Sequence, residues 1–350
     1  MSQARTSFDS SVAAALEASP PRIPVIVGPC GAGRTSLLHR LRARGEPAAC
    51  QYVSLARAVS TPERFLASVR AASPFDWPQP VDTPAGPREA FDLMAMFLTR
   101  ARTGSGRPAT FLLDEFLEVK TFEHFPGLRH AVTELIGELA ASDNRFVLTT
   151  RFVFRMLREL RAAPDRFAVL HLPPLAIDDV AEPLRRQAGL SASAADEAAR
   201  VVLALTDGRA AYAGDVVRMM ASRGADGRDP VAAFAALLAP GGEINHRCRH
   251  SYEFRLHRAR GYGSLKAVLG ILADEEPLNL TEIAARMQRT PGSTKDYLGW
   301  LQDVDLVAVE RKRYRVADPV LRLWISLHTR CDAPEPAEVG KAVRRYASSI

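Results

Sequence analysis

Cysteine is scarce in this 350-residue sequence, and its four cysteines stand far apart. No CxxC pair occurs, which excludes the usual zinc-binding patterns and leaves no disulfide framework. Sparse, unpaired cysteines fit a reducing compartment. The four positions are Cys30, Cys50, Cys248 and Cys331.

Long apolar runs are also missing. No stretch approaches the roughly 18–20 apolar residues that a membrane-spanning helix needs. The start of the chain, MSQARTSFDSSVAAALEASPPR, lacks the basic region, apolar core and cleavage site of a signal peptide. We therefore expect a cytoplasmic protein with no membrane partner.

The charge balance is basic but only modestly so. A formal net charge of +6 and a pI near 9.3 permit contact with nucleic acid without requiring it. Hydrophobic residues at 47% and charged residues at 25% are ordinary for a globular protein. The length is sufficient for two or three domains.

Short apolar stretches alternate with helical ones in the first half of the chain. Ile23–Val27 is β-branched and followed by glycine, as is typical of a buried parallel strand. This alternation predicts an α/β domain with a five-stranded parallel sheet and helices on both faces. The other expected strands are Gln51–Leu55, Thr110–Leu113, Phe146–Thr149 and Arg166–Leu170, and the expected helices are Thr35–Arg42, Phe91–Arg102 and Leu128–Ala141.

The second half of the chain reads differently. Paired prolines in Leu172–Leu175 end the sheet domain, and alanine-rich segments up to Leu238 predict helices only. Further on, Asn279 and Glu282 form a capping-box pattern that starts a helix. Three helices and a two-stranded wing then predict a winged helix-turn-helix. Its helices begin near Leu265, Asn279 and Thr290–Pro291, and its strands are Leu306–Glu310 and Arg313–Val316.

A glycine-rich segment, GPCGAGRT, lies between the first expected strand and its helix. It fits the phosphate-binding pattern G-x-x-x-x-G-K-[ST] at every fixed position except the lysine. Glycines let backbone N–H groups converge on a phosphate, and the following helix directs its positive end at the same anion. The alternative is a glycine-rich joint that holds no nucleotide. The expected nucleotide-binding residues here are Gly28, Pro29, Cys30, Gly31, Ala32, Gly33, Arg34, Thr35 and Ser36.

Arg34 stands where the pattern has lysine. Arginine keeps the positive charge but presents a planar fork in place of a compact ammonium, so the exchange is not neutral. A domain that binds ATP and hydrolyses it slowly is one consequence. Thr35 is expected to give its hydroxyl to Mg²⁺.

The segment FLLDE consists of an apolar strand that ends in two adjacent carboxylates, Asp114 and Glu115. Charges at the end of a buried strand are costly unless something binds there. In a P-loop enzyme Asp114 holds the Mg²⁺ shell and Glu115 polarises the attacking water. A solvated strand end is the alternative.

The strand FVLTTR ends in two hydroxyls and an arginine. In a P-loop sheet this strand lies between the P-loop strand and the strand that carries Asp114. We therefore predict that Thr149 or Thr150 senses the phosphate or the water, and that Arg151 neutralises developing charge. The alternative for Arg151 is a surface residue that opens the next helix.

The winged helix is a candidate DNA-binding module. Its turn, Arg311–Lys312, is flanked by further basic residues that suit phosphate contacts, whereas its third helix offers Lys295 beside Asp296 and few base-reading side chains. Docking of a protein partner is the alternative. The candidate DNA contacts are Lys295, Arg311, Lys312 and Arg313, with a basic helix upstream at Arg247, Arg249, Arg255, Arg258 and Arg260.

Taken together, these segments resemble the archaeal-type ATPases of the STAND/AAA+ P-loop NTPase superfamily, which end in a winged helix. The resemblance is carried by GPCGAGRTS, LLDEF, FVLTTR and TEIAARM…YLGWLQDVDLV…YRVADPVLRLWI, with Asp318, Pro319 and Trp324 in the last segment. It extends from about Phe8 to Leu327.

The resemblance implies a nucleotide-driven switch in which ATP and ADP states differ in how the lid and winged helix dock. By position, Arg34 and Thr35 would contact phosphate and magnesium, Asp114 and Glu115 would form the Walker B pair, and Arg151 would be the sensor arginine. One departure lies in the lid. The segment Thr206–Ala210 (TDGRA) has no proline after its glycine, and Arg209 there is either a second nucleotide sensor or a helix-start arginine.

The predicted organisation is a P-loop NTPase domain over 1–171, a helical lid over 172–238 and a linker helix region over 239–263. A winged helix over 264–327 and a tail over 328–350 follow. The leading hypothesis is a slowly hydrolysing ATPase switch that uses ATP and Mg²⁺ and relays its state to DNA or a protein partner. The alternatives are a DNA-binding regulator with a hydrolytically weak P-loop, and a partner-recognition module that forms homo-oligomers.

Overall fold

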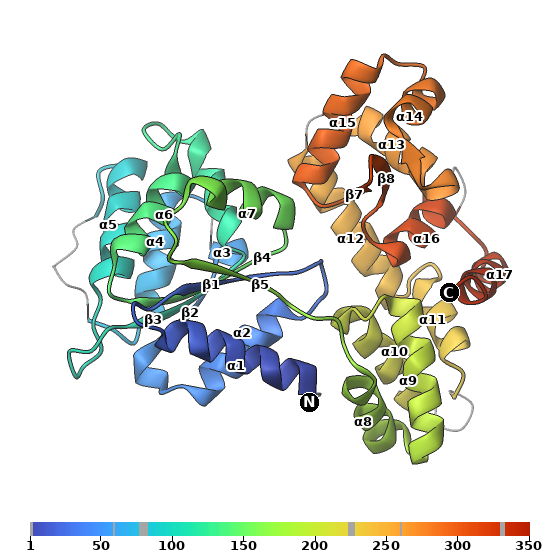
Figure 1. The fold of residues 1–350 in the computed structure, drawn as a ribbon, viewed down its shortest axis with the longest axis horizontal. Coiled ribbons are helices and arrows are strands. Elements are labelled where there is room, and N and C mark those ends of the chain that lie inside the picture. The colour runs from blue at the N-terminus through green and yellow to red at the C-terminus, as the bar shows by residue number, and fades with distance from the viewer. Residues whose placement is uncertain (1–2, 59, 77–82, 223–227, 260, 330–332) are drawn as a thin grey trace. The chain divides into compact units, whose positions relative to one another are not determined.

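The computed structural model describes residues 3–58, 60–76, 83–222, 228–259, 261–329 and 333–350 (Figure 1). Arg260 and Cys331 lie outside the described residues. The chain forms two compact units. The first, which we call the sheet unit, comprises Thr6–Gly28 and Gly33–Leu172. The second, the helical unit, comprises Pro173–Ile350 with the loop residues Pro29–Ala32 and the described residues up to Arg5. The finer five-part division stays a prediction.

Five parallel strands form the core of the sheet unit, in the order β2–β3–β4–β1–β5. Every residue of β1 is buried, as expected of a strand covered on both faces. β4 lies between β1 and β3, with Leu148 opposite both Val25 and Leu113. The predicted sheet is confirmed. Its strands are β1 (Ile23–Val27), β2 (Cys50–Ser54), β3 (Thr110–Asp114), β4 (Arg145–Thr150) and β5 (Phe167–His171).

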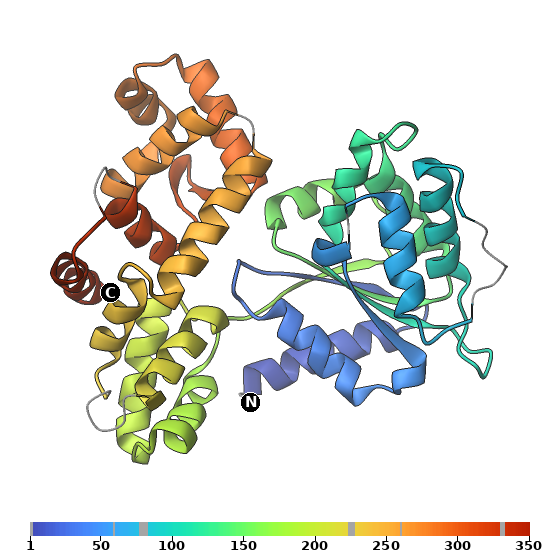
Figure 2. The ribbon, with the colours of Figure 1, turned by 180° about the vertical axis from the view of Figure 1, so that it is seen from behind.

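Helices cover both faces of this sheet (Figures 1 and 2). α1 and α2 lie on one side, and α4, α5 and α6 lie on the other. The helices are α1 (Gln3–Glu17), α2 (Arg34–Arg44), α3 (Leu55–Ala58), α4 (Pro62–Ala71), α5 (Pro87–Arg100), α6 (Ala131–Ala141) and α7 (Val153–Glu159). Short 3-10 segments are η1 (Pro47–Ala49), η2 (Phe116–His124) and η3 (Leu160–Ala162).

Phenylalanines fill the space between β3 and the helices above it. Phe111 meets Phe75 and Phe97 edge to face, with ring centroids 5.4 and 5.7 Å apart, and stacks on Phe146 at 5.8 Å. Such aromatic contacts add to the stabilisation that comes from burying the rings. The packing fixes β3 and β4 side by side, and the side chains at their carboxyl ends are positioned accordingly.

The helical unit contains only helices between residue 173 and residue 259 in the part of the chain that the structure describes, as predicted. They are α8 (Ile177–Ala188), α9 (Ala192–Thr206), α10 (Ala210–Ser222), α11 (Pro230–Leu238) and α12 (Glu243–Arg258). The cap of α11 is Asp229, whose carboxylate accepts from the N–H of Val231 at 2.8 Å. A proline follows at the first helical position, where its missing N–H costs nothing.

Residues 262–316, here called the winged-helix region, contain the predicted three helices and hairpin. The capping box is present: Glu282 N donates to Asn279 Oδ1 at 2.9 Å, and Asn279 N donates to Glu282 Oε2 at 2.7 Å. A short strand before α14 was not predicted and makes the sheet three-stranded, in the order β6–β8–β7. The elements are α13 (Tyr262–Glu275), β6 (Leu278–Asn279), α14 (Leu280–Met287), α15 (Pro291–Asp303), β7 (Val307–Glu310) and β8 (Arg313–Val316).

Two helices, α16 (Pro319–His328) and α17 (Pro336–Ala347), complete the helical unit. α17 packs on α11, where the rings of Phe234 and Tyr346 stack at 6.4 Å, so the segment predicted as a tail contains a packed helix. Among the described residues, no helix has the length and apolar character needed to cross a bilayer.

Candidate functional site

The glycine-rich loop leaves the end of β1 and leads directly into α2. Gly31 and Gly33 have φ values of 79° and 99°, a region that other residues rarely adopt. Gly33 is also the N-cap of α2, and no side chain caps that helix. A helix N-terminus that no side chain caps, following a glycine-rich loop, is the arrangement of a phosphate site.

Asp114, the last residue of β3, receives three hydroxyl groups. Thr35 donates to its Oδ2 at 2.8 Å, Tyr52 donates to the same oxygen at 2.9 Å, and Thr149 donates to Oδ1 at 2.5 Å. The first two of these donors lie on α2 and β2, and Thr149 lies on β4. One carboxylate thus joins the start of α2 to three strands of the sheet.

Tyr52 was not foreseen from the sequence. Burial raises the pKa of its phenol to about 12, and the nearby Asp114 carboxylate contributes in the same direction. The hydroxyl therefore stays protonated and acts as a donor at neutral pH. Its ring packs against His39 of α2, with centroids 4.5 Å apart.

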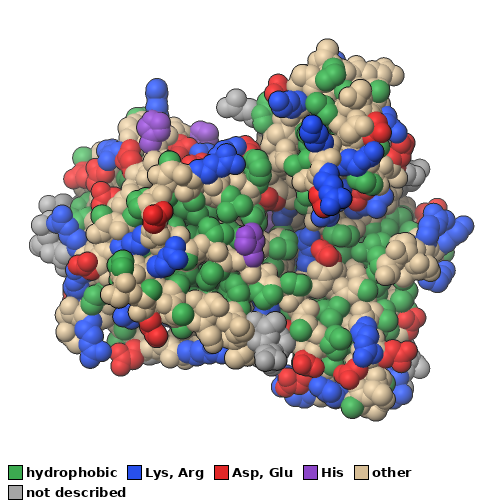
Figure 3. All heavy atoms as spheres, in the orientation of Figure 1, with side chains coloured by type: hydrophobic (Ala, Val, Ile, Leu, Met, Phe, Trp, Pro, Cys, Tyr) green, Lys and Arg blue, Asp and Glu red, His purple; other side chains and the backbone are tan. Residues whose placement is uncertain are grey.

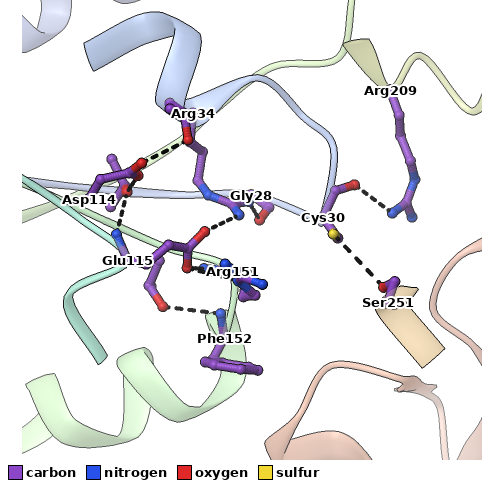
Figure 4. Close-up of polar contacts among 12 residues, drawn as sticks. Gly28, Cys30, Arg34, Asp114, Glu115, Arg151, Phe152, Arg209 and Ser251 are labelled. Atoms are coloured by element: carbon purple, nitrogen blue, oxygen red, sulfur yellow. Dashed lines mark hydrogen bonds and ion pairs between the residues drawn. The ribbon is translucent and has the colours of Figure 1, made fainter. Parts of the chain in front are cut away.

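Glu115 follows Asp114 and lies between two arginines (Figure 4). Its Oε1 is 3.0 Å from Arg34 Nη2, and its Oε2 is 3.1 Å from Arg151 Nε. The backbone N–H of Arg151 also donates to Oε2 at 2.9 Å. Burial by itself would raise the pKa of Glu115, but the charges of Arg34 and Arg151 outweigh it, and the pKa lies below its ordinary value.

Arg34 is buried along with its partner, with side-chain exposures of 6% for Arg34 and 8% for Glu115. Its second nitrogen donates to the carbonyl of Gly28. The guanidinium thus bridges the first residue of the loop and Glu115. The sequence predicts that Arg34 contacts phosphate, whereas the contacts seen here include those with Glu115 and the Gly28 carbonyl. Ser36, on the first turn of α2, is exposed.

The two threonines at the end of β4 take different places. Thr149 donates to Asp114 and accepts from the N–H of Glu115 at 3.1 Å, so it contacts both carboxylate residues. Thr150 accepts from the N–H of Phe152 at 3.1 Å. Thr149 is therefore the one that lies among the site residues, and Thr150 supports the turn into α7.

Arg209 lies in the helical unit and is only 4% exposed. Its Nη1 is 3.0 Å from Asp318 Oδ2 and donates to the carbonyl of Cys30 at 3.2 Å. The hydroxyl of Tyr212 donates to the same Asp318 oxygen at 3.0 Å. The carbonyl of Gly31 accepts from Ala211 N at 2.9 Å. Within this unit, the loop residues Pro29–Ala32 thus contact the start of α10.

The candidate DNA contacts of the winged-helix region are exposed. Lys295 lies on α15, and Arg311, Lys312 and Arg313 lie at the tip of the hairpin. Lys and Arg side chains gather on the visible face of the helical unit over α15 and the hairpin (Figure 3). A fourth basic residue of the hairpin, Arg315, is exposed as well.

The basic helix expected upstream needs a correction. Arg255 of α12 is 3% exposed and donates to the carbonyl of Asp305 at 2.8 Å. It holds α12 against the winged-helix region and offers no charge to a polyanion. Arg247 is partly engaged too, since its Nε donates to Asp215 at 2.6 Å.

No group of three or more His, Cys, Asp or Glu side chains among the described residues is arranged to hold a metal ion. A P-loop site does not require one, since Mg²⁺ there keeps several waters and binds one or two protein oxygens plus phosphate. Thr35 and Asp114, whose oxygens lie 2.8 Å apart, fit that need.

No family model and no curated protein matches the chain. Solved structures do. The Walker-type ATPase PABY2304 of Pyrococcus abyssi superposes with a TM-score of 0.66 at 16% identity, covering 92% of this chain and 95% of that one. The Aeropyrum pernix ORC1 protein in complex with DNA gives 0.46 at 18% identity, with 98% and 91% covered. A mutant of Thermotoga maritima RuvB gives 0.41 at 15% identity, with 89% and 92% covered. At these identities the first match shows that the fold is that of a Walker-type ATPase, and the other two are too distant to add to it.

Proposed function

We propose that this protein binds ATP with Mg²⁺ in the loop Gly28–Thr35 and hydrolyses it slowly. The observation that carries the proposal is the contact between Thr35 on α2 and Asp114 at the end of β3. This places a hydroxyl and a carboxylate together beneath a loop whose helix has no side-chain cap. The fold shared with a Walker-type ATPase supports the same conclusion.

Each residue has a role under this proposal. Thr35 and Asp114 would hold the magnesium ion, which supplies positive charge to the phosphate groups. The loop N–H groups and Arg34 bind phosphate oxygens. Glu115 orients and polarises the attacking water, and Arg151 stabilises charge that develops in the reaction.

Slow turnover follows from the position of Arg34. Glu115 is held by Arg34 on one side and Arg151 on the other, so its carboxylate is fully engaged before any substrate arrives. A phosphate group must draw Arg34 away before Glu115 gains freedom to contact water. The planar fork of arginine, which binds carboxylates well, makes this exchange harder than it would be for lysine.

We further propose that the helical unit senses whether a phosphate is bound at the loop Gly28–Thr35. Arg209 joins the Cys30 carbonyl to Asp318, and Asp318 is the N-cap of α16, which follows β8 of the winged-helix region. A phosphate bound at the loop would change the backbone that Arg209 contacts. The resulting shift in α16 is a route by which nucleotide state reaches the winged-helix region, and from there DNA or a protein partner.

The test is nucleotide binding and phosphate release by the purified protein. We expect saturable binding of ATP with Mg²⁺ that is lost in Asp114→Ala and Arg34→Ala. Glu115→Gln should bind ATP but release no phosphate. Undiminished affinity in both alanine variants would rule out the assignment of the site, and an unchanged rate in Glu115→Gln would remove that residue from the catalytic role.

A second candidate is a DNA-binding regulator with weak hydrolysis, and the basic hairpin favours it. Arg311 and Lys312 form its turn with φ values of 49° and 65°, a conformation for which Asn-Gly is the preferred pair. The variant Arg311→Asn with Lys312→Gly should therefore preserve the hairpin while removing two charges.

Binding of duplex DNA measured against salt concentration tests this candidate. We expect the variant to bind more weakly and with a lower salt dependence, by roughly one unit of slope per lost phosphate contact. Phosphate release with and without duplex DNA then separates the two candidates. Equal DNA binding by both proteins would show that the hairpin does not contact DNA.

A further inference from the structure

The helical unit contains a cavity of about 780 Å³ that lies between α12, α13 and α16. Three of its lining residues, Asn245, Arg249 and Tyr252, share one face of α12 at helical spacing. Gly270 of α13 also lines it, and a Cβ atom built there would meet nothing within 4 Å. The missing side chain leaves the space open. A volume of this size is within the range of small-molecule sites.

One side of the cavity is aromatic and rigid. Trp324 of α16 lies 5.4 Å from Tyr252 and stacks on His328 at 5.5 Å with an interplanar angle of 14°. The indole Nε1–H of Trp324 donates to Asn245 Oδ1 at 2.6 Å. This bond fixes the orientation of the asparagine amide and leaves its NH₂ group as a donor.

Two of the polar groups that line the cavity, Tyr252 and Arg249, are donors. Tyr252 is only 1% exposed, yet its hydroxyl makes no hydrogen bond within the part of the chain that the structure describes. The guanidinium of Arg249 likewise has no carboxylate or carbonyl partner among the described residues. Both side chains line the open space of the cavity, so each can donate to a ligand atom placed there.

One carboxylate of the lining, Glu253, already has two donors. Glu253 accepts from Lys266 Nζ at 3.3 Å and from the hydroxyl of Tyr262 at 2.5 Å. Lys266 lies in turn over the Tyr262 ring, 4.3 Å from its centroid. Two carboxylates line the cavity, Glu253 and Asp274, and the charge of Glu253 is thus neutralised by Lys266. Arg249 and Tyr252 remain as donors that favour an anion.

We propose that this cavity binds a small organic anion that carries a planar ring. Its carboxylate or phosphate group would accept from Arg249 and Tyr252, and its ring would pack on the aromatic side formed by Trp324 and His328. The site uses no residue of the loop Gly28–Thr35 or of the carboxylates beside it. It is therefore independent of the proposed nucleotide site, and the two proposals fail separately.

The experiment uses three small probes of similar shape and different charge: benzoate, phenyl phosphate and neutral benzamide. The readout is the indole N–H resonance of Trp324 in protein labelled with ¹⁵N-tryptophan. The three indole signals are assigned with Trp300→Phe and Trp77→Phe. We expect saturable shifts of the Trp324 signal with benzoate and phenyl phosphate. Benzamide should bind at least tenfold more weakly, because a neutral amide forms weaker hydrogen bonds with a guanidinium than an anion does.

Two variants and one control complete the test. Arg249→Gln should weaken both anions about tenfold or more, and Tyr252→Phe should weaken them a few-fold, as loss of one hydrogen bond implies. Arg258→Gln removes another exposed arginine from α12 that does not line the cavity, and should change neither affinity. If Tyr252→Phe fails to fold, the variant Arg249→Gln still tests the proposal, because Arg249 is exposed and its replacement should not affect folding. The proposal is overturned if no shifts occur, if benzamide binds as tightly as the anions, or if Arg249→Gln leaves the affinity unchanged. Tighter binding of one anion would show whether the site prefers a carboxylate or a phosphate.

Discussion

The hydroxyl of Tyr52 on β2 lies 2.9 Å from Oδ2 of Asp114, on the neighbouring strand β3. The same oxygen accepts the hydroxyl of Thr35. A magnesium ion that binds Asp114 would have to share this oxygen with, or take it from, one of these donors. Tyr52 therefore positions the carboxylate from β2.

Tyr52→Phe should raise the Mg²⁺ concentration needed for half-maximal ATP binding by roughly three- to tenfold, as expected for loss of a hydrogen bond worth about 1 kcal/mol. The phenyl ring preserves the contact with His39, so the fold should tolerate the change. Titration of Mg²⁺ at a fixed concentration of a fluorescent ATP analogue measures the effect. A requirement equal to that of the wild type would show that Asp114 is held adequately by Thr35 and Thr149 alone.

Arg34→Lys should increase phosphate release several-fold. A lysine ammonium cannot bridge the Gly28 carbonyl and Glu115 as a guanidinium fork does, so Glu115 is freed at lower cost. Steady-state turnover under saturating Mg-ATP is the measurement. The matched control is Arg44→Lys on the same helix, whose side chain is 56% exposed and pairs with Asp9 at 2.7 Å. A slower Arg34→Lys enzyme would mean that the fork assists the reaction.

We expect acid to lower the stability of the nucleotide-free protein against unfolding, because Glu115 becomes protonated. Its pKa is lowered from an ordinary value of 4.5 by Arg34 and Arg151, which together outweigh burial. A carboxylate with a depressed pKa contributes stability above its unfolded pKa, and that contribution is lost as the pH falls through the folded pKa. Melting temperatures measured from about pH 6 to pH 3 should therefore drop less steeply in Glu115→Gln than in the wild type below about pH 4.5. Parallel profiles would contradict the coupling of Glu115 to its two arginines.

Arg209→Met should destabilise the protein by about 3 kcal/mol, because it leaves the buried Asp318 carboxylate without its cationic partner. Unfolding by urea, followed by circular dichroism, gives the free energy. Arg185→Met is the comparison, since the pair Arg185–Asp196 is 3.7 Å apart and about 40% exposed on both sides. Exposed pairs of this kind contribute at most about 1 kcal/mol. A similar decrease in the free energy of unfolding in the two variants would show that the buried Arg209–Asp318 pair contributes no more to stability than an exposed pair.

The strands and the loop were predictable from the sequence because their signals are local. β-branched runs, the glycine spacing after β1 and the capping box at Asn279 each depend on neighbours within a few residues. The place of β4 between β1 and β3 followed from the fold that the motifs indicate. The short strand β6 gave no such signal, since two residues are too few for a periodic pattern.

The side-chain partners were not predictable, because each joins residues far apart in the chain. The pairing of Tyr52 with Asp114 depends on the register of β2 against β3, where Tyr52 lies opposite Leu112. The Arg34–Glu115 pair and the burial of Arg255 depend likewise on packing. An arginine on an exposed helix and one that donates to a buried carbonyl look alike in sequence.

The two carboxylate oxygens of Asp318 contact different helices. Oδ1 accepts from the N–H groups of Val320 and Leu321 at the start of α16, and Oδ2 serves Tyr212 and Arg209 of the α10 segment. A single side chain thus sets where one helix begins and where another is anchored. Rotation or fraying at the start of α16 would move the carboxylate that also holds the start of α10. We therefore expect the two helix starts to move together.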